Sequence, residues 1–248
     1  MTRVLMILPA FNEEENILQT VAQIRTYEPP PDVRVDYLVI NDGSTDNTAA
    51  VCRRNGVPCL TLVQNLGIGG AVQTGYLYAA EKDYDIAVQF DGDGQHDILS
   101  LGRLIAPIID GTSDFVVGSR FLDGSSGFRS TVMRRIGIRF LSAMIRIVSH
   151  IRLTDVTSGY RAAGRNAIRF LSEHYPADYP EPESIVSLYK SGFRITEVPA
   201  NMFQRAHGRS SIDFGKSVYY MLKVSFAILC AGIQRKEARP HADSTAAD

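Results

Sequence analysis

The chain has 248 residues, of which 45% are hydrophobic, and its formal net charge is −1. This length and apolar content predict one large domain with a substantial core, and the near-zero charge excludes a global attraction to nucleic acid or to membranes. Three cysteines, odd in number and without metal-type spacing, indicate reduced thiols in a cytosolic protein. The start of the chain lacks the layout of a signal peptide, and the longest apolar stretch, residues 217–233, is too short to span a bilayer.

The first half of the chain alternates between strand-like and helix-like patterns. The expected strands are residues 4–8, 35–40, 59–63, 86–90 and 115–118. The expected helices between them are residues 14–27, 47–55, 70–82 and 98–109. Continuous apolar strands that alternate with helices predict an α/β fold, with a mostly parallel central sheet flanked by helices.

The second half has a less regular pattern. Its expected elements are a helix at residues 130–151, a turn at 154–159, a short helix at 165–171, a proline-rich loop at 176–182, a helix at 183–190, a strand at 194–199 and a helix at 214–233. We expect a main domain at residues 1–212, an amphipathic helix at 213–233 packed on it or at a membrane interface, and a disordered tail at 234–248.

Polar loops follow the first four expected strands, at residues 9–13, 41–46, 65–70 and 91–97. In open α/β sheets, ligands bind at the carboxyl ends of the strands. We therefore expect these four loops to converge on one binding site.

The loop after the fourth expected strand carries the most informative motif. Asp91 and Asp93 are separated by one glycine, so both carboxylates can turn toward one point at the strand end. Oxygen ligands that leave coordination positions open suit a divalent cation that clamps a diphosphate. The alternative is a solvated acidic turn, because Asp and Gly are common loop residues.

The loop after the first expected strand lies where a nucleotide would bind. Phe11 offers an aromatic face to a base, and Glu13 can accept hydrogen bonds from ribose hydroxyls. The alternative is a simple helix start, in which Asn12 is the N-cap and acidic residues occupy the first turn.

The second and third loops add further candidates. Asp42 can bind the base or the ribose, whereas Asp46 is expected to cap the helix that follows. The glycine-rich loop at residues 65–70 allows close backbone approach to a nucleotide sugar. It is not a Walker loop, because no Gly-Lys-Ser/Thr follows.

Seven short motifs occur along the chain, at residues 9–14, 41–45, 65–71, 91–96, 118–121, 158–161 and 197–211. As an ordered set they resemble the inverting family 2 glycosyltransferases of GT-A fold. The likeness covers roughly residues 3–212, and it is greatest to dolichol-phosphate mannose synthases and bacterial polyprenyl-phosphate glycosyltransferases. It implies a GT-A (Rossmann-like) sheet with C-terminal amphipathic helices.

The resemblance implies roles for individual residues. Asp91, Asp93 and Gln95 match the residues that hold Mg²⁺ or Mn²⁺. Arg120 matches an arginine that meets the acceptor phosphate, and Arg135 or Arg139 matches a second one. The nucleotide-binding set is Pro9, Phe11, Glu13, Asp42, Gly67, Asp91, Arg205, Arg209 and Ser210, of which the last three resemble a flexible loop that closes over the donor diphosphate.

Two positions depart from the family pattern. Ser211 stands where the mannose synthases usually carry lysine, and Ile138 lies near the place of an expected serine. These departures leave the identity of the sugar and of the lipid open.

A basic segment lies between Asp123 and Asp155, where the chain has six arginines and no acidic residue. On the expected helix, Arg135, Arg139 and Arg146 share one face. The opposite face is expected to be an apolar stripe of Met133, Ile136, Phe140, Met144, Ile147 and Ile151. This pattern favours an anionic membrane surface or a lipid-phosphate headgroup as the partner, and the alternative is an ordinary solvated helix face.

We expect a metal-dependent inverting glycosyltransferase that moves a sugar from a UDP- or GDP-sugar to a polyprenyl phosphate. The acceptor oxygen is then already ionised, so arginines position it while Asp93 acts in catalysis through the metal. The alternative is transfer to a hydroxyl of a lipid-linked cell-wall or capsular glycan, such as rhamnosyl or glucosyl addition, which requires a base. Glu183 is the candidate base, with Asp155 and Glu181 in reserve, although Glu183 also suits the first turn of a helix.

Two remote alternatives are a nucleotidyltransferase and an inactive scaffold. The first is disfavoured because no glycine-rich Arg/Lys signature follows the first strand, and the second because Asp91 and Asp93 are both present. We expect a cytoplasmic protein that is peripheral on the cytoplasmic face of the membrane. It would have a small membrane partner or form a homo-oligomer, and it would not bind nucleic acid.

Overall fold

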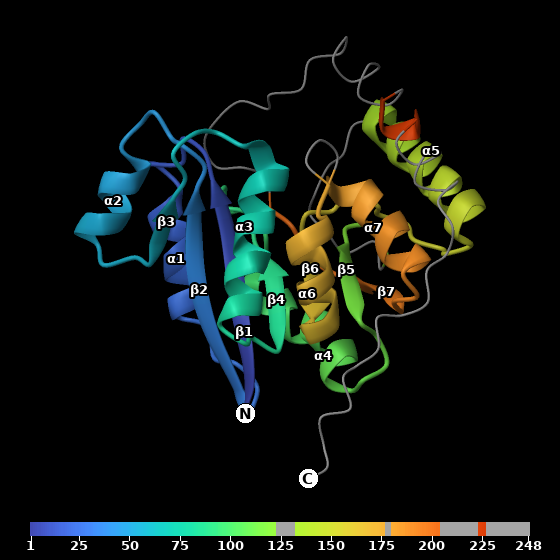
Figure 1. Cartoon of the computed structure of the whole chain (residues 1–248), viewed down its shortest axis with the longest axis horizontal. Helices are drawn as coiled ribbons and strands as arrows, with labels where there is room; N and C mark the ends of the chain where they lie inside the picture. The colour runs from blue at the N-terminus through green and yellow to red at the C-terminus, as the bar shows by residue number, and fades with distance from the viewer. Residues whose placement is uncertain (123–131, 177–179, 204–222, 227–248) are drawn as a thin grey trace.

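A seven-stranded sheet forms the centre of the structure (Figure 1). The strands are β1 (Thr2–Ala10), β2 (Val33–Asn41), β3 (Cys59–Thr61), β4 (Ile86–Gln89), β5 (Phe115–Ser119), β6 (Arg161–Gly164) and β7 (Ile195–Pro199). Their order in the sheet is β3-β2-β1-β4-β6-β5-β7, and every neighbouring pair is parallel except the two that involve β6. This computed structural model describes residues 1–122, 132–176, 180–203 and 223–226. It confirms the expected α/β fold with a mostly parallel sheet.

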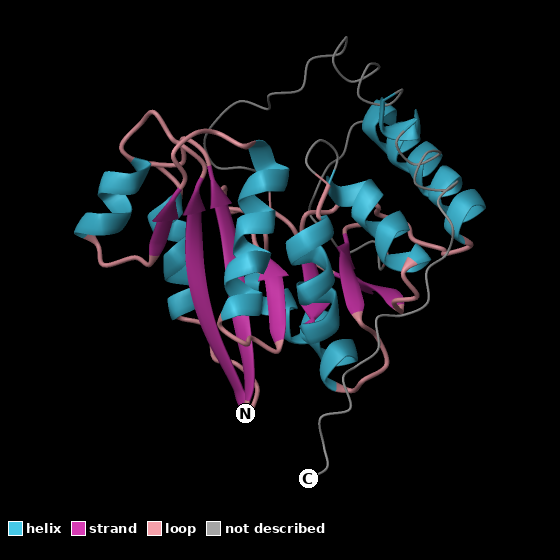
Figure 2. Ribbon diagram, viewed as in Figure 1, coloured by secondary structure: helices cyan, strands magenta, loops and turns pink. Residues whose placement is uncertain are grey.

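Helices cover both faces of the sheet (Figure 2). They are α1 (Ile17–Arg25), α2 (Thr48–Arg54), α3 (Gly67–Glu81), α4 (Leu101–Ile109), α5 (Val132–Ser149), α6 (Arg165–His174) and α7 (Pro180–Lys190), with a short 3-10 turn η1 (Ile98–Ser100) before α4. In Figure 1, α3 and α6 lie side by side in front of the sheet, and α1 lies behind it. The helix α5 lies at the edge of the molecule, next to α7.

The alternation of side chains along β1 explains why the molecule has two cores. Leu5 and Ile7 pack on the face covered by α3, α6 and α7, whereas Val4, Met6 and Leu8 pack on the face covered by α1 and α4. Successive residues of a strand point to opposite faces, so a continuous apolar strand has to be covered on both sides.

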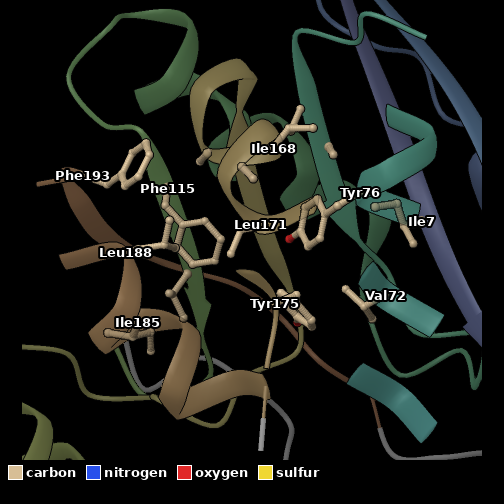
Figure 3. Close-up of a cluster of buried hydrophobic side chains, with 14 of the residues drawn as sticks. Ile7, Val72, Tyr76, Phe115, Ile168, Leu171, Tyr175, Ile185, Leu188 and Phe193 are labelled. Atoms are coloured by element: carbon tan, nitrogen blue, oxygen red, sulfur yellow. The ribbon is translucent and has the colours of Figure 1, made fainter. Parts of the chain in front are cut away.

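The core on the α3 side contains much of the aromatic packing of the fold (Figure 3). Tyr76 from α3 lies against Tyr175, with ring centroids 5.4 Å apart. Phe115 from β5 and Leu171 from α6 complete this part of the cluster. The same packing fixes Tyr175, whose hydroxyl group reaches toward the end of β4.

Several sequence expectations require correction. The four-residue strand β6 was not expected, because Arg-Ala-Ala-Gly has none of the β-branched or aromatic residues typical of strands. The helix α1 begins at Ile17 rather than at residue 14, and α3 begins at Gly67 rather than at residue 70. The expected proline-rich loop ends earlier, because α7 begins at Pro180. Proline is tolerated in the first turn of a helix, where its missing N–H is not needed.

The expected apolar stripe of α5 is only partly confirmed. Met144 and Ile151 are partly buried against the core, and the burial of Met133 is not described. Among residues 135–149, the buried positions are instead Ile138, Leu141, Ile145 and Ser149. Ile136, Phe140 and Ile147 are instead exposed, by 55%, 48% and 75% of their surface. The helix therefore presents both apolar and basic side chains to solvent, because Arg135, Arg139 and Arg146 are exposed as well.

The C-terminal region lies mostly outside the described residues. Residues 223–226 are helical, in agreement with the expected helix at 214–233, and the expected tail at 234–248 is not among the described residues. Of the helices that the structure describes, none is both long and apolar enough to cross a membrane.

The close contact of α3 with β1 gives a test of the fold. A Cβ atom at Gly75 would overlap the fully buried side chain of Ile7, so we expect Gly75→Ala to overpack this core. The free energy of unfolding, measured with urea, should fall by about 1–2 kcal/mol, even though alanine is the better helix former.

Gly102→Ala in α4 is the matched control, because the nearest atom to its added Cβ is the Tyr27 hydroxyl oxygen at an ordinary 3.5 Å. This variant should be as stable as the wild type or slightly more stable. Equal destabilisation of both variants would contradict the packing described for α3.

Candidate active site

A cavity of about 320 Å³ opens at the carboxyl ends of β1, β2 and β4, which are neighbours in the sheet. It is lined by Pro9, Ala10, Phe11, Glu13, Asp42, Ile68, Ala71, Asp91, Gly92 and Asp93. The structure thus brings together most of the described residues that were expected to bind the nucleotide. Gly67 is not part of the lining. It has a φ of 77° at the start of α3, next to Ile68, which is part of it.

The loops after β1 and β2 are joined through Asn12. Its side-chain oxygen accepts the backbone N–H groups of Thr45 at 2.8 Å and Asp46 at 3.3 Å, and its own N–H donates to the Ser44 hydroxyl at 3.0 Å. Asn12 has a φ of 57°, a left-handed conformation that asparagine tolerates better than most residues. The alternative in which Asn12 caps α1 is therefore wrong, because the N-cap position belongs to Asn16.

The acidic residues of the second loop have different local roles. Asp42 is buried, lines the cavity and accepts the backbone N–H of Leu66 at 2.7 Å, so it also fixes the third loop. Asp46 was expected to cap the next helix, but the N-cap position of α2 belongs to Asn47. The Asp46 carboxylate still accepts the N–H of Thr48, the first residue of α2, at 2.9 Å. One loop thus supplies a carboxylate to the cavity and a second one to the start of α2.

Asp91 is held in place from two sides. The amide of Gln89 donates to Asp91 Oδ1 at 3.1 Å, and the hydroxyl of Tyr175 donates to Gln89 Oε1 at 3.4 Å. These contacts orient the Gln89 amide so that its NH₂ group faces Asp91. The side chain of Asp91 keeps 32% of its surface exposed, so the carboxylate can still meet a ligand in the cavity.

His96 is the second group that positions Asp91. It is buried and stacks on Tyr160 with ring centroids 4.7 Å apart, and this burial lowers the pKa of His96. Its Nδ1 accepts the Asp91 N–H at 3.1 Å, so the proton of the neutral ring is on Nε2, 3.6 Å from Asp91 Oδ2. The roles of Gln89 and His96 were not predicted from the sequence, since neither residue can be linked to Asp91 without the fold.

The turn before β6 lies directly against Asp91. A Cβ atom at Gly159 would be 2.9 Å from Asp91 Oδ2 and 3.1 Å from Gln89 Nε2, so a larger residue here would displace the Asp91 carboxylate from its position. The turn is fixed by Arg161, which is 1% exposed and donates to the carbonyl oxygens of Ser158 at 2.6 Å and Val156 at 2.9 Å.

Asp93 and Gln95 form a tight turn at the rim of the cavity. Asp93 is 8% exposed and accepts the N–H of Gln95 at 3.0 Å across Gly94, which has a φ of 74°. The carbonyl oxygen of Gln95 accepts the N–H of Phe203 at 2.7 Å, so the segment after β7 is attached to this turn. Gln95 does not line the cavity.

The donor set at this turn suits a hard divalent cation. Within the described residues, no three His, Cys, Asp or Glu side chains form a ready-made metal cage. Mg²⁺ is commonly held by one or two carboxylates together with the phosphates of a substrate. Asp91 and Asp93, both in the lining of one cavity, provide such a pair.

Arg120 and Asp155 form a buried ion pair. Arg120 is 6% exposed, and its Nε and Nη2 each lie 2.6 Å from an oxygen of the Asp155 carboxylate, which is fully buried. Nη2 also donates to the Thr157 hydroxyl at 2.9 Å. This geometry does not favour Asp155 as a base, because both of its oxygens already accept hydrogen bonds from an arginine.

Glu197 of β7 orders the segment that carries Asp155. It accepts the backbone N–H of Thr154 at 2.8 Å and that of Asp155 at 2.7 Å. This role of Glu197 was not predicted from the sequence. The only signal was the position of Glu197 at the start of the last of the seven motifs.

The two glutamates at the start of α7 are both partly buried. Burial raises the pKa of Glu181, the charge of Asp91 raises it further, and Arg161 and Arg120 oppose this rise. Glu181 therefore lies within electrostatic reach of both Asp91 and Arg120. Its carbonyl oxygen accepts a hydrogen bond from Arg161 Nη1 at 2.6 Å, which ties α7 to the turn before β6.

Two of the remaining candidates, Arg135 and Arg139, do not line this cavity. Arg135 and Arg139 are exposed on α5, and no hydrogen bond or ion pair joins either of them to another residue that the structure describes. Arg205, Arg209 and Ser210 lie outside the described residues, on the segment that begins just after Phe203.

Comparison with known proteins places the chain among sugar transferases. Residues 6–171 match the family described as glycosyl transferase family 2. The chain is similar to the UDP-N-acetylglucosamine–dolichyl-phosphate N-acetylglucosaminyltransferase of Methanococcus voltae, with 29% identity over 88% of this chain and 93% of the relative. It is also similar to the undecaprenyl-phosphate mannosyltransferase of Micrococcus luteus, with 31% identity over 86% of this chain and 88% of the relative.

A solved structure supports the same assignment at the level of the fold. The glucosyl-3-phosphoglycerate synthase of Mycobacterium tuberculosis, in complex with Mn²⁺, UDP-glucose and phosphoglyceric acid, has a TM-score of 0.67 and 21% identity, covering 93% of this chain and 79% of that one. This likeness confirms the expected GT-A fold. Because the family match spans more than half of the sequence, the chain belongs to glycosyl transferase family 2 and is a glycosyltransferase.

Proposed function

We propose that the protein transfers a sugar, with inversion, from a UDP- or GDP-sugar to a polyprenyl phosphate, and that it requires Mg²⁺ or Mn²⁺. The observation that carries this proposal is the cavity at the ends of β1, β2 and β4. The aromatic ring of Phe11, which can stack on a base, lies in the same lining as Asp91 and Asp93. The names of the two relatives, which transfer sugars to dolichyl and undecaprenyl phosphates, support the choice of acceptor.

The charge of the cavity supports the metal requirement. Four carboxylates are part of its lining: Glu13, Asp42, Asp91 and Asp93. A diphosphate would be repelled by these groups. A cation between Asp91 and Asp93 would offset the negative charge of both the carboxylates and the diphosphate. When bound, Mg²⁺ or Mn²⁺ supplies positive charge to the diphosphate leaving group. The mycobacterial protein of the same fold was crystallised with Mn²⁺ and UDP-glucose, which supports the choice of a divalent metal and a nucleotide sugar.

The chain's own residues would then position the two substrates. Glu13 and Asp42 offer acceptors to the ribose and base, and Gln89 and His96 hold Asp91 in a fixed orientation. Preorganised groups of this kind lower the barrier because they need no rearrangement during the reaction. Arg205 and Arg209 follow Phe203, which is attached to the Asp93–Gln95 turn, and this position supports their proposed role near the diphosphate.

Arg120 would bind the acceptor phosphate. Its guanidinium group is buried and held by Asp155, so it is positioned in advance, and Asp155 offsets its charge until a phosphate arrives. A polyprenyl phosphate is anchored in a membrane, and we propose that the protein acts as a peripheral protein on the cytoplasmic face.

A second candidate acceptor, a glycan hydroxyl, is favoured by one observation. Burial raises the pKa of Glu181, and this residue lies within electrostatic reach of Asp91 and Arg120, as expected of a base near the reacting groups. Between the two glutamates of α7, we therefore favour Glu181 over Glu183 as the base for a hydroxyl acceptor.

The direct test of the proposed reaction is transfer from a panel of radiolabelled UDP- and GDP-sugars, with Mg²⁺ or Mn²⁺, to undecaprenyl phosphate in detergent. We expect a lipid-soluble, acid-labile product that disappears when EDTA removes the metal. Metal-dependent hydrolysis of a donor without any lipid product would instead favour the glycan hydroxyl. Lipid product formed equally well in EDTA would contradict the metal requirement.

Asp93→Asn tests the metal site without removing the turn. The new amide keeps the oxygen that accepts the Gln95 N–H but loses the charge that a cation needs, so the fold should be retained. We expect kcat to fall by at least about 100-fold, by analogy with the loss of other charge-stabilising groups. The matched control is Asp110→Asn at an exposed position after α4, which should leave kcat unchanged. Near-normal turnover of Asp93→Asn would remove the metal role.

Glu181→Gln and Glu183→Gln, compared side by side, distinguish the two acceptors. Transfer to an ionised phosphate needs no base, so we expect both variants to keep kcat within about tenfold of the wild type. Loss of a general base typically lowers the rate by about 10²–10⁴-fold. Such a loss in Glu181→Gln alone, with normal donor binding, would overturn the phosphate acceptor in favour of a hydroxyl.

A further inference from the structure

A second hollow, of about 600 Å³, lies between α5 and the segment that follows it. It shares no lining residue with the cavity at the strand ends. Three arginines line it, Arg139, Arg146 and Arg152, together with the apolar side chains of Ala143, Ile147 and Leu153. Of these residues, only Arg139 was a candidate for the proposed reaction, and Arg146, Arg152 and the apolar side chains have no role in it.

The three arginines are available for a ligand. Arg139, Arg146 and Arg152 are all exposed, and none of them forms an ion pair or a hydrogen bond with another residue in the described ranges. Like charges gathered around one hollow repel each other, and an anion placed between them would relieve that repulsion. Guanidinium groups bind phosphate oxygens particularly well, because their planar N–H pairs match the phosphate geometry.

The apolar side chains beside the hollow indicate which anion fits. Ile136, Phe140 and Ile147 are exposed along one side of α5, next to the arginine side. Helical periodicity places positions 136, 140, 143 and 147 together, and Arg139 and Arg146 border them. Single exposed apolar side chains are common, but several large ones gathered on one helix side are typical of a contact with a protein or a membrane. A basic strip bordered by an apolar strip matches the boundary between lipid headgroups and acyl chains.

We propose that this hollow binds the phosphate headgroup of an anionic phospholipid of the bilayer, with the exposed apolar side chains of α5 inserted among the acyl chains. The ligand is a membrane lipid and not the sugar acceptor. The segment that lines the hollow continues through Thr154 into Asp155, which pairs with Arg120. A lipid bound here would therefore hold Arg120 near the bilayer surface, a consequence that rests on the proposed function.

The test uses the full chain and the double variant Arg146→Gln/Arg152→Gln, which leaves Arg120 and Arg139 intact. Binding is measured by flotation with phosphatidylcholine vesicles, with and without phosphatidylglycerol. The matched control is Arg103→Gln/Arg169→Gln, which removes the same charge from exposed positions on α4 and α6. Transfer activity in detergent and the circular dichroism spectrum are recorded for each protein.

We expect the wild type to bind the phosphatidylglycerol vesicles more strongly than the neutral ones. The double variant should lose roughly 30-fold in affinity for the anionic vesicles, since each basic residue near a charged surface contributes about fivefold. The control should bind like the wild type, and activity in detergent should be unchanged in both variants.

Two outcomes would overturn the lipid site. One is equal binding of the wild type to both kinds of vesicle, and the other is an equal loss of binding in the two double variants, which would reflect net charge alone. Absence of transfer activity in every protein, with lipid binding as expected, would count against the proposed reaction and leave the lipid site supported.

Discussion

The buried guanidinium group of Arg161 is the interaction on which the geometry of the site depends. In the part of the chain that the structure describes, it forms no ion pair with a carboxylate. Its hydrogen bonds go to the carbonyl oxygens of Val156, Ser158 and Glu181 and to the Ser184 hydroxyl. An arginine stays charged at any pH that a protein experiences, so each of these acceptors is needed to compensate for its burial. The cation thus forces the turn before β6 and the start of α7 into one arrangement around it.

That arrangement links the core to the reacting groups. The clamped turn places Gly159 against the Asp91 carboxylate and carries Asp155 to Arg120. From the other side, Tyr175 in the aromatic core orients Gln89, which in turn orients Asp91. A carboxylate approached from both sides in this way has little freedom to move. Such preorganisation suits a site that has to bind a cation and a diphosphate without rearranging.

The cavity could be predicted from the sequence because β1, β2 and β4 are apolar runs that end in polar loops, and parallel neighbours bring such loops together. The strand β6 could not be predicted, because Arg-Ala-Ala-Gly forms a strand only through its pairing with β4 and β5.

The buried face of α5 was misassigned for a related reason. Ile138 and Leu141 compete with Ile136 and Phe140 for the core, and only the packing against the rest of the fold decides between the two faces. The pairing of Arg120 with Asp155 could not be predicted either, because the two residues are 35 positions apart in the sequence.

The central claim of this account is that Asp91 and Asp93 hold a divalent cation against a nucleotide diphosphate. The most direct measurement is anomalous X-ray diffraction at the manganese edge, from crystals of the protein grown with Mn²⁺ and UDP or GDP. The account predicts a single manganese peak between the two carboxylates and the diphosphate, in the cavity at the ends of β1, β2 and β4. A nucleotide bound in that cavity without manganese, or manganese bound away from Asp91 and Asp93, would contradict it.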